Sequence, residues 1–85
     1  MNEDGFRTFL ESQFTAKAAQ TRLTRARKAE QILGYSLDEA VLTDEKMYTA
    51  LIALQTHDRL QNSVRKYYIF KNGHEFPRLN DYRRL

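Results

Sequence analysis

Helix start and stop signals recur along this chain and leave little room for other secondary structure. Thr15 and Thr43 each precede a segment with apolar residues at helical spacing, and a threonine hydroxyl can accept the N-cap hydrogen bond from the first helical turn. Gly34 and Gly73 each follow such a segment, where glycine takes a left-handed conformation at little cost. The pattern predicts an all-α fold, a small four-helix bundle with an extended or partly helical C-terminal tail.

Four main helices and one very short helix are expected between these signals. In chain order they are a helix from about Glu3 to Phe14, a helix from the Thr15 cap to Leu33, a single turn capped by Ser36, a helix capped by Thr43, and a helix from the Asp58 cap to Gly73. Around the Thr43 cap, Leu42 and Met47 stand at the two positions of a hydrophobic staple, so we expect them to pack together.

The last segment differs from the rest of the chain. Phe76-Pro77 interrupts any helix, because the residue before proline is pushed towards extended geometry. We therefore expect a helical domain over residues 1–74 and a tail over residues 75–85. Three interpretations of the tail stay open: an ordered arm, a short final helix from about Asn80, or an interdomain linker.

Length and composition set the class of protein. A chain of 85 residues without cysteine must be stabilised by a packed core and well-formed helix ends, and 41% hydrophobic residues are enough for such a core. No apolar run is long enough to cross a bilayer, and the acidic start, Met1 to Asp4, is the opposite of a secretory leader. We expect a soluble, cytoplasmic domain.

The position of the charges is more informative than the net charge of +3. Residues 15–33 contain five cations against Glu30 alone, and residues 58–74 contain four against Asp58. Between them, residues 37–47 are acidic. If the two basic segments pack side by side, the surface is polarised, as in proteins that bind nucleic acid.

The expected second helix has one arc without any acidic side chain. Cations on such an arc suit phosphates, and threonine or glutamine suits phosphate oxygens or base edges. The alternative is an ordinary solvated face, although those usually mix both signs of charge. Together with two cations of the last helix, this surface supplies the candidate DNA-binding residues: Lys17, Thr21, Thr24, Arg25, Arg27, Lys28, Arg65 and Lys66.

The last main helix alternates cations with aromatic side chains between Ser63 and Phe70. We expect Tyr67 and Phe70 to pack inward and Tyr68 to lie at the surface, where its hydroxyl could reach a phosphate. Arg65 and Lys66 have little evident structural purpose, so they are the best contact candidates on this helix.

The sequence shows no catalytic machinery, so we expect a protein that is not an enzyme and needs no cofactor. His57 and His74 have no cysteine or acidic partner at metal-ligand spacing, so no metal site is expected. The acidic residues stand at helix starts, where capping explains them, and the three glycines are too scattered for a phosphate loop.

Three motifs support a family resemblance. They are an opening helix with Phe6-Arg7-Thr8-Phe9-Leu10, the turn Tyr35-Ser36-Leu37-Asp38-Glu39-Ala40, and a late helix with Ser63-Val64-Arg65-Lys66-Tyr67-Tyr68-Ile69-Phe70. Over about residues 5–73 the chain resembles the N-terminal core-binding, SAM-like domain of tyrosine recombinases (phage integrases). In that family the domain is a four-helix bundle that holds one side of a DNA duplex opposite a catalytic domain.

The resemblance implies DNA contacts at six positions: Thr21, Thr24, Arg25, Lys28, Arg65 and Lys66. It also implies double-stranded DNA as the partner, with a C-terminal catalytic domain or self-association on DNA completing the clamp. The arginine, histidine and tyrosine constellation of the catalytic domain is not in this chain, which therefore cannot recombine DNA alone.

Two other function classes stay open. The chain could be a small protein-interaction adaptor whose basic face meets an acidic partner and whose apolar patch is Leu79, Tyr82 and Leu85. A minimal nuclease ranks last, because no carboxylate cluster is evident to hold magnesium.

Overall fold

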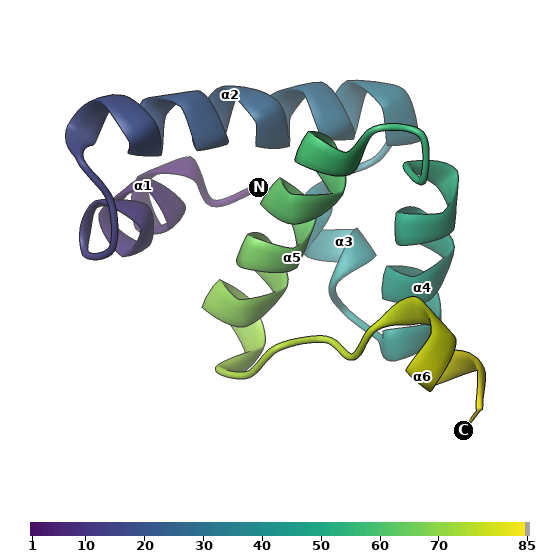
Figure 1. Cartoon of the computed structure of the whole chain (residues 1–85). Coiled ribbons are helices and arrows are strands. Elements are labelled where there is room, and N and C mark those ends of the chain that lie inside the picture. The colour runs from purple at the N-terminus through teal and green to yellow at the C-terminus, as the bar shows by residue number, and fades with distance from the viewer. Residues whose placement is uncertain (85) are drawn as a thin grey trace.

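A computed structural model describes residues 1–84 of the chain, and these residues form an all-α bundle (Figure 1). The predicted fold class is confirmed. Six helices follow one another: α1 (Glu3–Glu11), α2 (Ala16–Leu33), α3 (Leu37–Ala40), α4 (Asp44–Ala53), α5 (Asp58–Asn72) and α6 (Leu79–Arg83).

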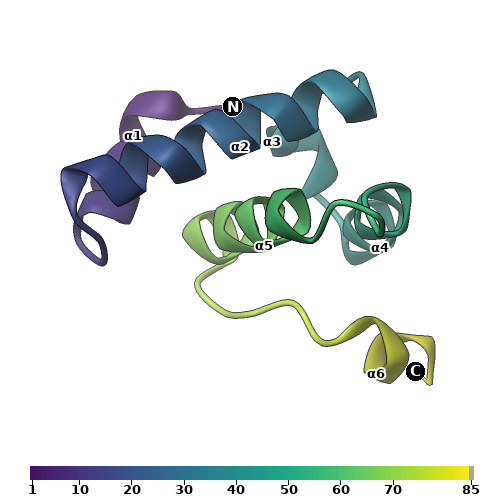
Figure 2. The same cartoon turned by 45° about the horizontal axis from the view of Figure 1, so that its top comes forward.

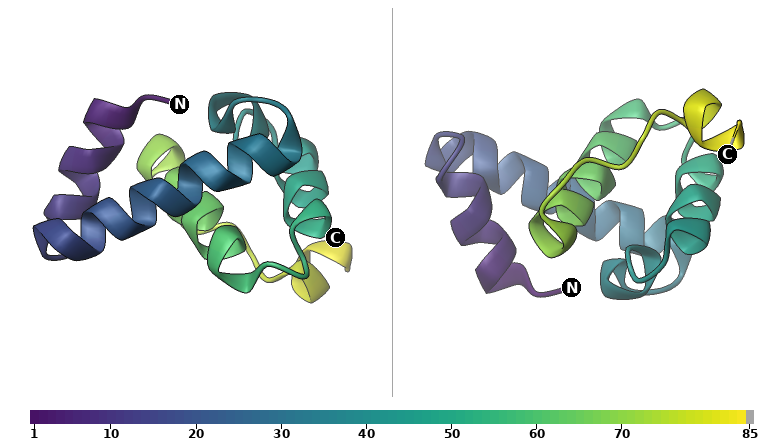
Figure 3. Two further views of the ribbon diagram at one scale, coloured as in Figure 1. Left: turned by 90° about the horizontal axis from the view of Figure 1, so that it is seen from above. Right: turned by 90° about the horizontal axis from the view of Figure 1, so that it is seen from below.

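The centre of the bundle is the crossing of α2 and α5, the pair of helices with the most extensive contact. Seen from above, α2 passes over α5 at a steep angle, with α1 and α4 on either side (Figure 3). The face of α2 that meets the other helices has Ala19, Ala26 and Ala29, all fully buried, around Leu23. Small side chains let two helix backbones approach closely, so this stripe explains why the longest helix lies across the bundle.

Aromatic side chains fix α1 against α5. Phe6 is fully buried and meets Tyr67 edge-on, with 4.9 Å between ring centroids, and Phe9 lies 5.5 Å from Phe70. Gly5 permits this approach, because a Cβ there would lie 2.9 Å from the Phe70 ring. The prediction that Tyr67 and Phe70 pack inward is confirmed, with Tyr67 fully buried and Phe70 half-buried against the core.

Most of the helix ends occur where the sequence predicts them. The hydroxyls of Thr15 and Thr43 accept hydrogen bonds from the backbone N–H groups of Ala18 and Lys46, both at 3.2 Å. Gly34 and Gly73 end α2 and α5 with φ of 82° and 78°. Local capping chemistry therefore determines the length of α2 and the end of α5.

Three expectations about helix ends are wrong. α1 ends at Glu11 and not at Phe14, because residues 12–14 turn the chain back towards α2. Asp58 is the first residue of α5 and not its cap, since His57 takes the cap position without a side-chain hydrogen bond. Leu42 is 72% exposed while Met47 is fully buried, so the two do not form a staple.

The tail packs onto the bundle through aromatic contacts. Phe76 is buried beside Tyr68 and stacks on Tyr82, which in turn stacks on Tyr48 of α4 at 5.0 Å. In Figure 2, α5 lies between α2 and the tail, which ends beside α4 in α6. The structure thus contains the short final helix that was one of the three interpretations of the tail.

A group of polar side chains closes the bundle at the start of the chain. The Tyr67 hydroxyl donates to Asp38 and accepts from the Asn2 N–H at 2.8 Å, and this donated bond lowers the pKa of Asp38. Asp38 also pairs with the Met1 ammonium at 3.4 Å. We call this group the polar cluster, and its members are Met1, Glu30, Ser36, Asp38, Tyr67 and Lys71.

The expectation that Tyr68 lies at the surface is wrong. Its side chain is only 3% exposed, and its hydroxyl donates to Asp44 at the start of α4, at 2.8 Å. Burial, followed by the bond to Asp44, raises the pKa of Tyr68 to about 12. Tyr68 therefore joins α5 to α4 and leaves the contact candidates on α5 to Arg65 and Lys66.

Candidate nucleic-acid interface

The outward side of α2 presents one row of polar side chains. Lys17, Thr21, Thr24 and Lys28 recur at helical spacing on the side opposite the buried alanines, and all four are exposed. Thr21 and Thr24 donate their hydroxyl hydrogens to the carbonyls four residues earlier, at 3.1 and 3.0 Å. The hydroxyl oxygen of Thr21 is therefore placed to accept a hydrogen bond, as from the amino group of a base, whereas that of Thr24 already accepts one from Gln20 Nε2 at 3.4 Å and has one acceptor position left.

Arg27 lies on the flank of α2 that faces α1, away from the other candidates. Its Nε donates to Glu3 at 3.0 Å, and this hydrogen bond lowers the pKa of Glu3. On the same flank, Arg7 of α1 donates to Gln20 at 2.6 Å. The structure thus joins Arg27 to α1 and does not bring it next to Arg65 or Lys66.

The opposite flank of α2, towards α5, has Arg22 and Arg25. Arg22 lies over the ring of Phe14, 4.1 Å from its centroid, and Lys66 of α5 lies 5.4 Å from the same ring. The ammonium of Lys66 also donates to Gln13 at 3.0 Å. The turn between α1 and α2 therefore holds two cations from different helices against one aromatic ring.

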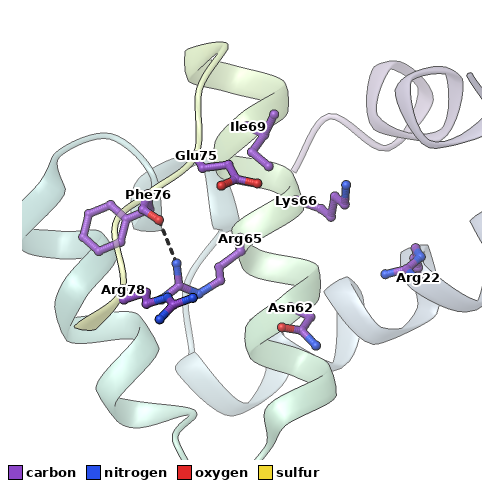
Figure 4. Close-up of a pocket in the computed structure, with 8 residues that line it drawn as sticks. All are labelled: Arg22, Asn62, Arg65, Lys66, Ile69, Glu75, Phe76 and Arg78. Atoms are coloured by element: carbon purple, nitrogen blue, oxygen red, sulfur yellow. Dashed lines mark hydrogen bonds between the residues drawn. The ribbon is translucent and has the colours of Figure 1, made fainter. Parts of the chain in front are cut away.

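A hollow of about 300 Å³ opens where α2, α5 and the tail meet (Figure 4). Four cations surround it, with a single carboxylate, that of Glu75. We call this site the basic hollow. It is lined by Arg22, Asn62, Arg65, Lys66, Ile69, Glu75, Phe76 and Arg78.

Arg65 lines the basic hollow and also stabilises the fold. Its guanidinium donates to the backbone carbonyls of Phe76 and Pro77, at 2.9 and 3.2 Å (Figure 4 shows the first bond). Burial lowers the pKa of Arg65, and the nearby charge of Glu75 opposes that shift. The expectation that Arg65 has little structural purpose is wrong, because it holds the tail against α5.

A second, shallower hollow adjoins the first along α2. It is lined by Thr15, Lys17, Ala18, Thr21, Arg22 and Arg25. Arg22 belongs to both hollows, so the cations of α2 and those around α5 and the tail form one continuous surface. We call this surface the basic face and assign to it the six cations of the two hollows and the exposed Lys28 of α2: Lys17, Arg22, Arg25, Lys28, Arg65, Lys66 and Arg78.

The ion pairs of the protein lie outside the basic face. Within residues 1–84, they use Arg27, Lys46, Lys71 and the terminal ammonium as cations, and none uses a member of the basic face. The acidic residues of α3 and α4 are partly neutralised in the same way, since Lys46 bonds to Glu39 at 3.1 Å. Of the eleven lysine and arginine side chains in no ion pair of the described chain, the basic face has seven, while Arg7, Arg59, Arg83 and Arg84 lie elsewhere. The basic face is therefore the largest group of unpaired cations among these residues, and it can attract an anion.

Sequence reasoning found five members of the basic face and missed two, Arg22 and Arg78. For Arg22 a signal existed, since it lies one helical turn before Arg25 and beside the small residues that admit α5. Arg78 follows a proline in a tail whose path the sequence left open. Only the packing of Phe76 brings it to the basic hollow.

The described part of the chain offers no cluster of three or more histidine, cysteine, aspartate or glutamate side chains to hold a metal ion. None of its helices is long and apolar enough to span a membrane. Comparisons with protein-family models, curated proteins and solved structures give no match for this chain. The site must therefore be interpreted from its own geometry and charge.

Proposed function

We propose that this protein binds double-stranded DNA through the basic face, mainly by phosphate contacts and with low sequence specificity. The observation that supports the proposal most strongly is the set of seven cations that belong to no ion pair within residues 1–84 and lie on adjoining surfaces of α2, α5 and the tail. An ordinary solvated surface mixes charges of both signs, whereas the basic hollow has four cations and a single carboxylate, that of Glu75.

The dimensions of α2 agree with such a partner. From Lys17 to Lys28 the helix rises about 16 Å at 1.5 Å per residue. The major groove is about 12 Å wide, so the row could reach from one phosphate backbone to the other. Thr21 and Thr24 would then face the base edges between them, with the hydroxyl oxygen of Thr21 available as an acceptor and that of Thr24 shared with Gln20.

In the same proposal, the protein acts as one half of a clamp on the duplex. Four or five phosphate contacts correspond to a log–log salt slope of about −4 and a non-specific Kd of about 10⁻⁴ to 10⁻⁶ M. Binding this weak becomes useful when a second domain or a second copy holds the same duplex, because linkage can add a factor of about 10² or more. A recombinase core-binding domain has this arrangement, and the proposal extends to that role in DNA integration or recombination.

Fluorescence anisotropy with a labelled random duplex tests the proposal. We expect micromolar binding at low salt that weakens about 250-fold between about 50 and 200 mM salt, as a slope of about −4 implies. The double variant K17Q/R25Q should bind about tenfold more weakly and lower the salt slope by about two. The matched control is K46Q/K71Q, which removes the same charge from two cations that are already in ion pairs.

Two results would overturn this function. One is the absence of salt-dependent binding by the wild-type chain at low salt. The other is an equal loss of affinity in the two double variants, which would show that net charge and not the basic face is responsible.

The adaptor alternative has less support from the geometry. Leu79 and Tyr82 are half-buried and pack against the core, so they do not form a free apolar patch, and Leu85 lies outside the described residues. Among residues 1–84, the large apolar side chains with high exposure are Ile32 and Leu42. Chemical-shift changes confined to α4 or the tail on adding a partner, in the absence of DNA binding, would favour the adaptor.

A further inference from the structure

The basic hollow contains one acidic group, and that group comes from the tail. Glu75 extends from the segment after α5 towards the space between Arg65 and Lys66 (Figure 4). Its negative charge favours the protonated form of Arg65. Glu75 nevertheless belongs to none of the ion pairs in the described chain, so its carboxylate is near the cations without being fixed to one of them.

The backbone around Glu75 is held firmly while its side chain is exposed. Phe76 is buried in the core, and Arg65 donates to the carbonyls of Phe76 and Pro77. The side chain of Glu75 itself is exposed to solvent. It can therefore rotate out of the hollow by changing rotamer, without any movement of the tail.

We propose that Glu75 is an internal competitor for the basic hollow: in the free protein its carboxylate partly compensates the surrounding cations, and in the complex a phosphate of the duplex takes its place. The inference rests on the DNA-binding function proposed above. The hollow suits a phosphate because Arg22, Lys66 and Arg78 reach it from α2, α5 and the tail, and Asn62 adds an uncharged donor. The tail is then part of the binding site, through both Glu75 and Arg78.

The decisive comparison is between E75Q and E45Q in the full-length chain. Both variants remove one negative charge from an exposed glutamate, but Glu45 lies in the first turn of α4, outside the hollow. We expect E75Q to bind a random duplex about three- to tenfold more tightly than the wild type at low salt, because the repulsion between its carboxylate and the incoming phosphate is removed. E45Q should change the affinity less than twofold by the same screening argument.

A second pair of variants tests whether the hollow is occupied by a phosphate. R78Q and R84Q each remove one exposed arginine from the tail, but Arg78 lines the hollow and Arg84 does not. R78Q should lower the salt slope by about one and weaken binding several-fold, as expected for one lost phosphate contact. R84Q should leave the slope unchanged.

The outcomes separate the two proposals. If the wild-type chain binds DNA but E75Q and E45Q have equal affinity, Glu75 is not a competitor and this inference is overturned while the DNA-binding function stands. Equal salt slopes for R78Q and R84Q would also overturn it, since the hollow would then hold no phosphate. If the wild-type chain does not bind duplex DNA at all, the DNA-binding function fails first and this inference fails with it.

Discussion

The basic face and the polar cluster lie on the same bundle and use charge in opposite ways. In the polar cluster, Asp38 accepts from Tyr67 and pairs with the Met1 ammonium and with Lys71, so each charge has a partner. On the basic face, six cations surround two hollows, Lys28 lies beside them on α2, and none of the seven belongs to an ion pair within residues 1–84.

This difference separates the charges that hold the fold from those available to a ligand. A charge in a hydrogen-bonded ion pair contributes to stability, and removing its partner has a measurable cost. An unpaired surface cation contributes little to stability but adds to the field that an anion meets. Substitutions in the two regions should therefore change different measurements, and four variants test that separation in order of decreasing effect on stability.

The largest effect on stability is expected from Asp38→Ala. The Tyr67 hydroxyl and two cations lose their acceptor, and since Asp38 is about half exposed, we expect the free energy of unfolding to fall by about 1–2 kcal/mol. DNA affinity should not fall. Urea unfolding measures the first quantity and anisotropy the second, with Glu45→Ala as a control carboxylate outside the cluster.

The same variant should also change how the stability of the protein depends on pH. The hydrogen bond from Tyr67 keeps the pKa of Asp38 below its unfolded value of about 3.9. A lowered folded pKa gives stability that is present above the unfolded pKa and is lost as pH falls through the folded pKa. The stability difference between the wild type and Asp38→Ala should therefore shrink below about pH 4. A constant difference across that range would contradict the assignment.

Arg65 lies on the basic face and also holds the tail, so its substitution should change both stability and DNA affinity. Arg65→Lys keeps the charge but loses the guanidinium that donates to Phe76 and Pro77, so we expect about 1 kcal/mol less stability together with weaker DNA binding. Arg25→Lys is the matched control, and its stability should stay within about 0.5 kcal/mol of the wild type. Unchanged stability in Arg65→Lys would show that the tail is held without this side chain.

Tyr68→Phe should have a smaller effect, about 0.5–1 kcal/mol, from the lost bond to Asp44, which is exposed to solvent. The pKa of Tyr68, raised to about 12, adds a pH dependence. A raised folded pKa gives stability that is present below the unfolded value of about 10 and is lost as pH rises towards 12. Tyrosinate absorbance should show a late ionisation step in the wild type that the variant lacks, while DNA affinity is the same in both.

The smallest effect on stability is expected from Lys28→Gln, at an exposed position of the basic face. The free energy of unfolding should stay within about 0.5 kcal/mol, while the salt slope of DNA binding falls by about one. Thermal unfolding and a salt titration of the same preparation measure both. A loss of stability without a change in the salt slope of DNA binding would show that Lys28 stabilises the fold and does not contact DNA.

The helices themselves were largely predictable from the sequence, and the reason is visible at Thr15 and Gly34. The Thr15 hydroxyl accepts from the Ala18 N–H and the Gly34 N–H donates to the Glu30 carbonyl, so each end of α2 is controlled by a partner within four positions in the chain. Leu42 shows where such local rules fail. The staple pattern is present, but the chain before α4 turns the side chain outward to 72% exposure.

Candidate site residues were predictable only as members of helix faces. The row from Lys17 to Lys28 follows from helical periodicity, and the structure leaves it exposed. Tyr68 was assigned to the wrong side, because the burial of a residue at the edge of a stripe depends on whether another helix covers it. Here α4 does so, and Asp44 supplies the partner that its hydroxyl needs.

The sequence by itself determined the all-α class, the principal helix ends and the two basic segments, since these depend on interactions over a few residues and on composition. The tertiary structure alone decided which cations are paired. Arg27 meets Glu3, while Arg22 and Arg78, far apart in the chain, line one hollow with Arg65 and Lys66. The physical reason is that electrostatic partnership depends on distance in space, and that distance is set by how α2, α5 and Phe76 pack.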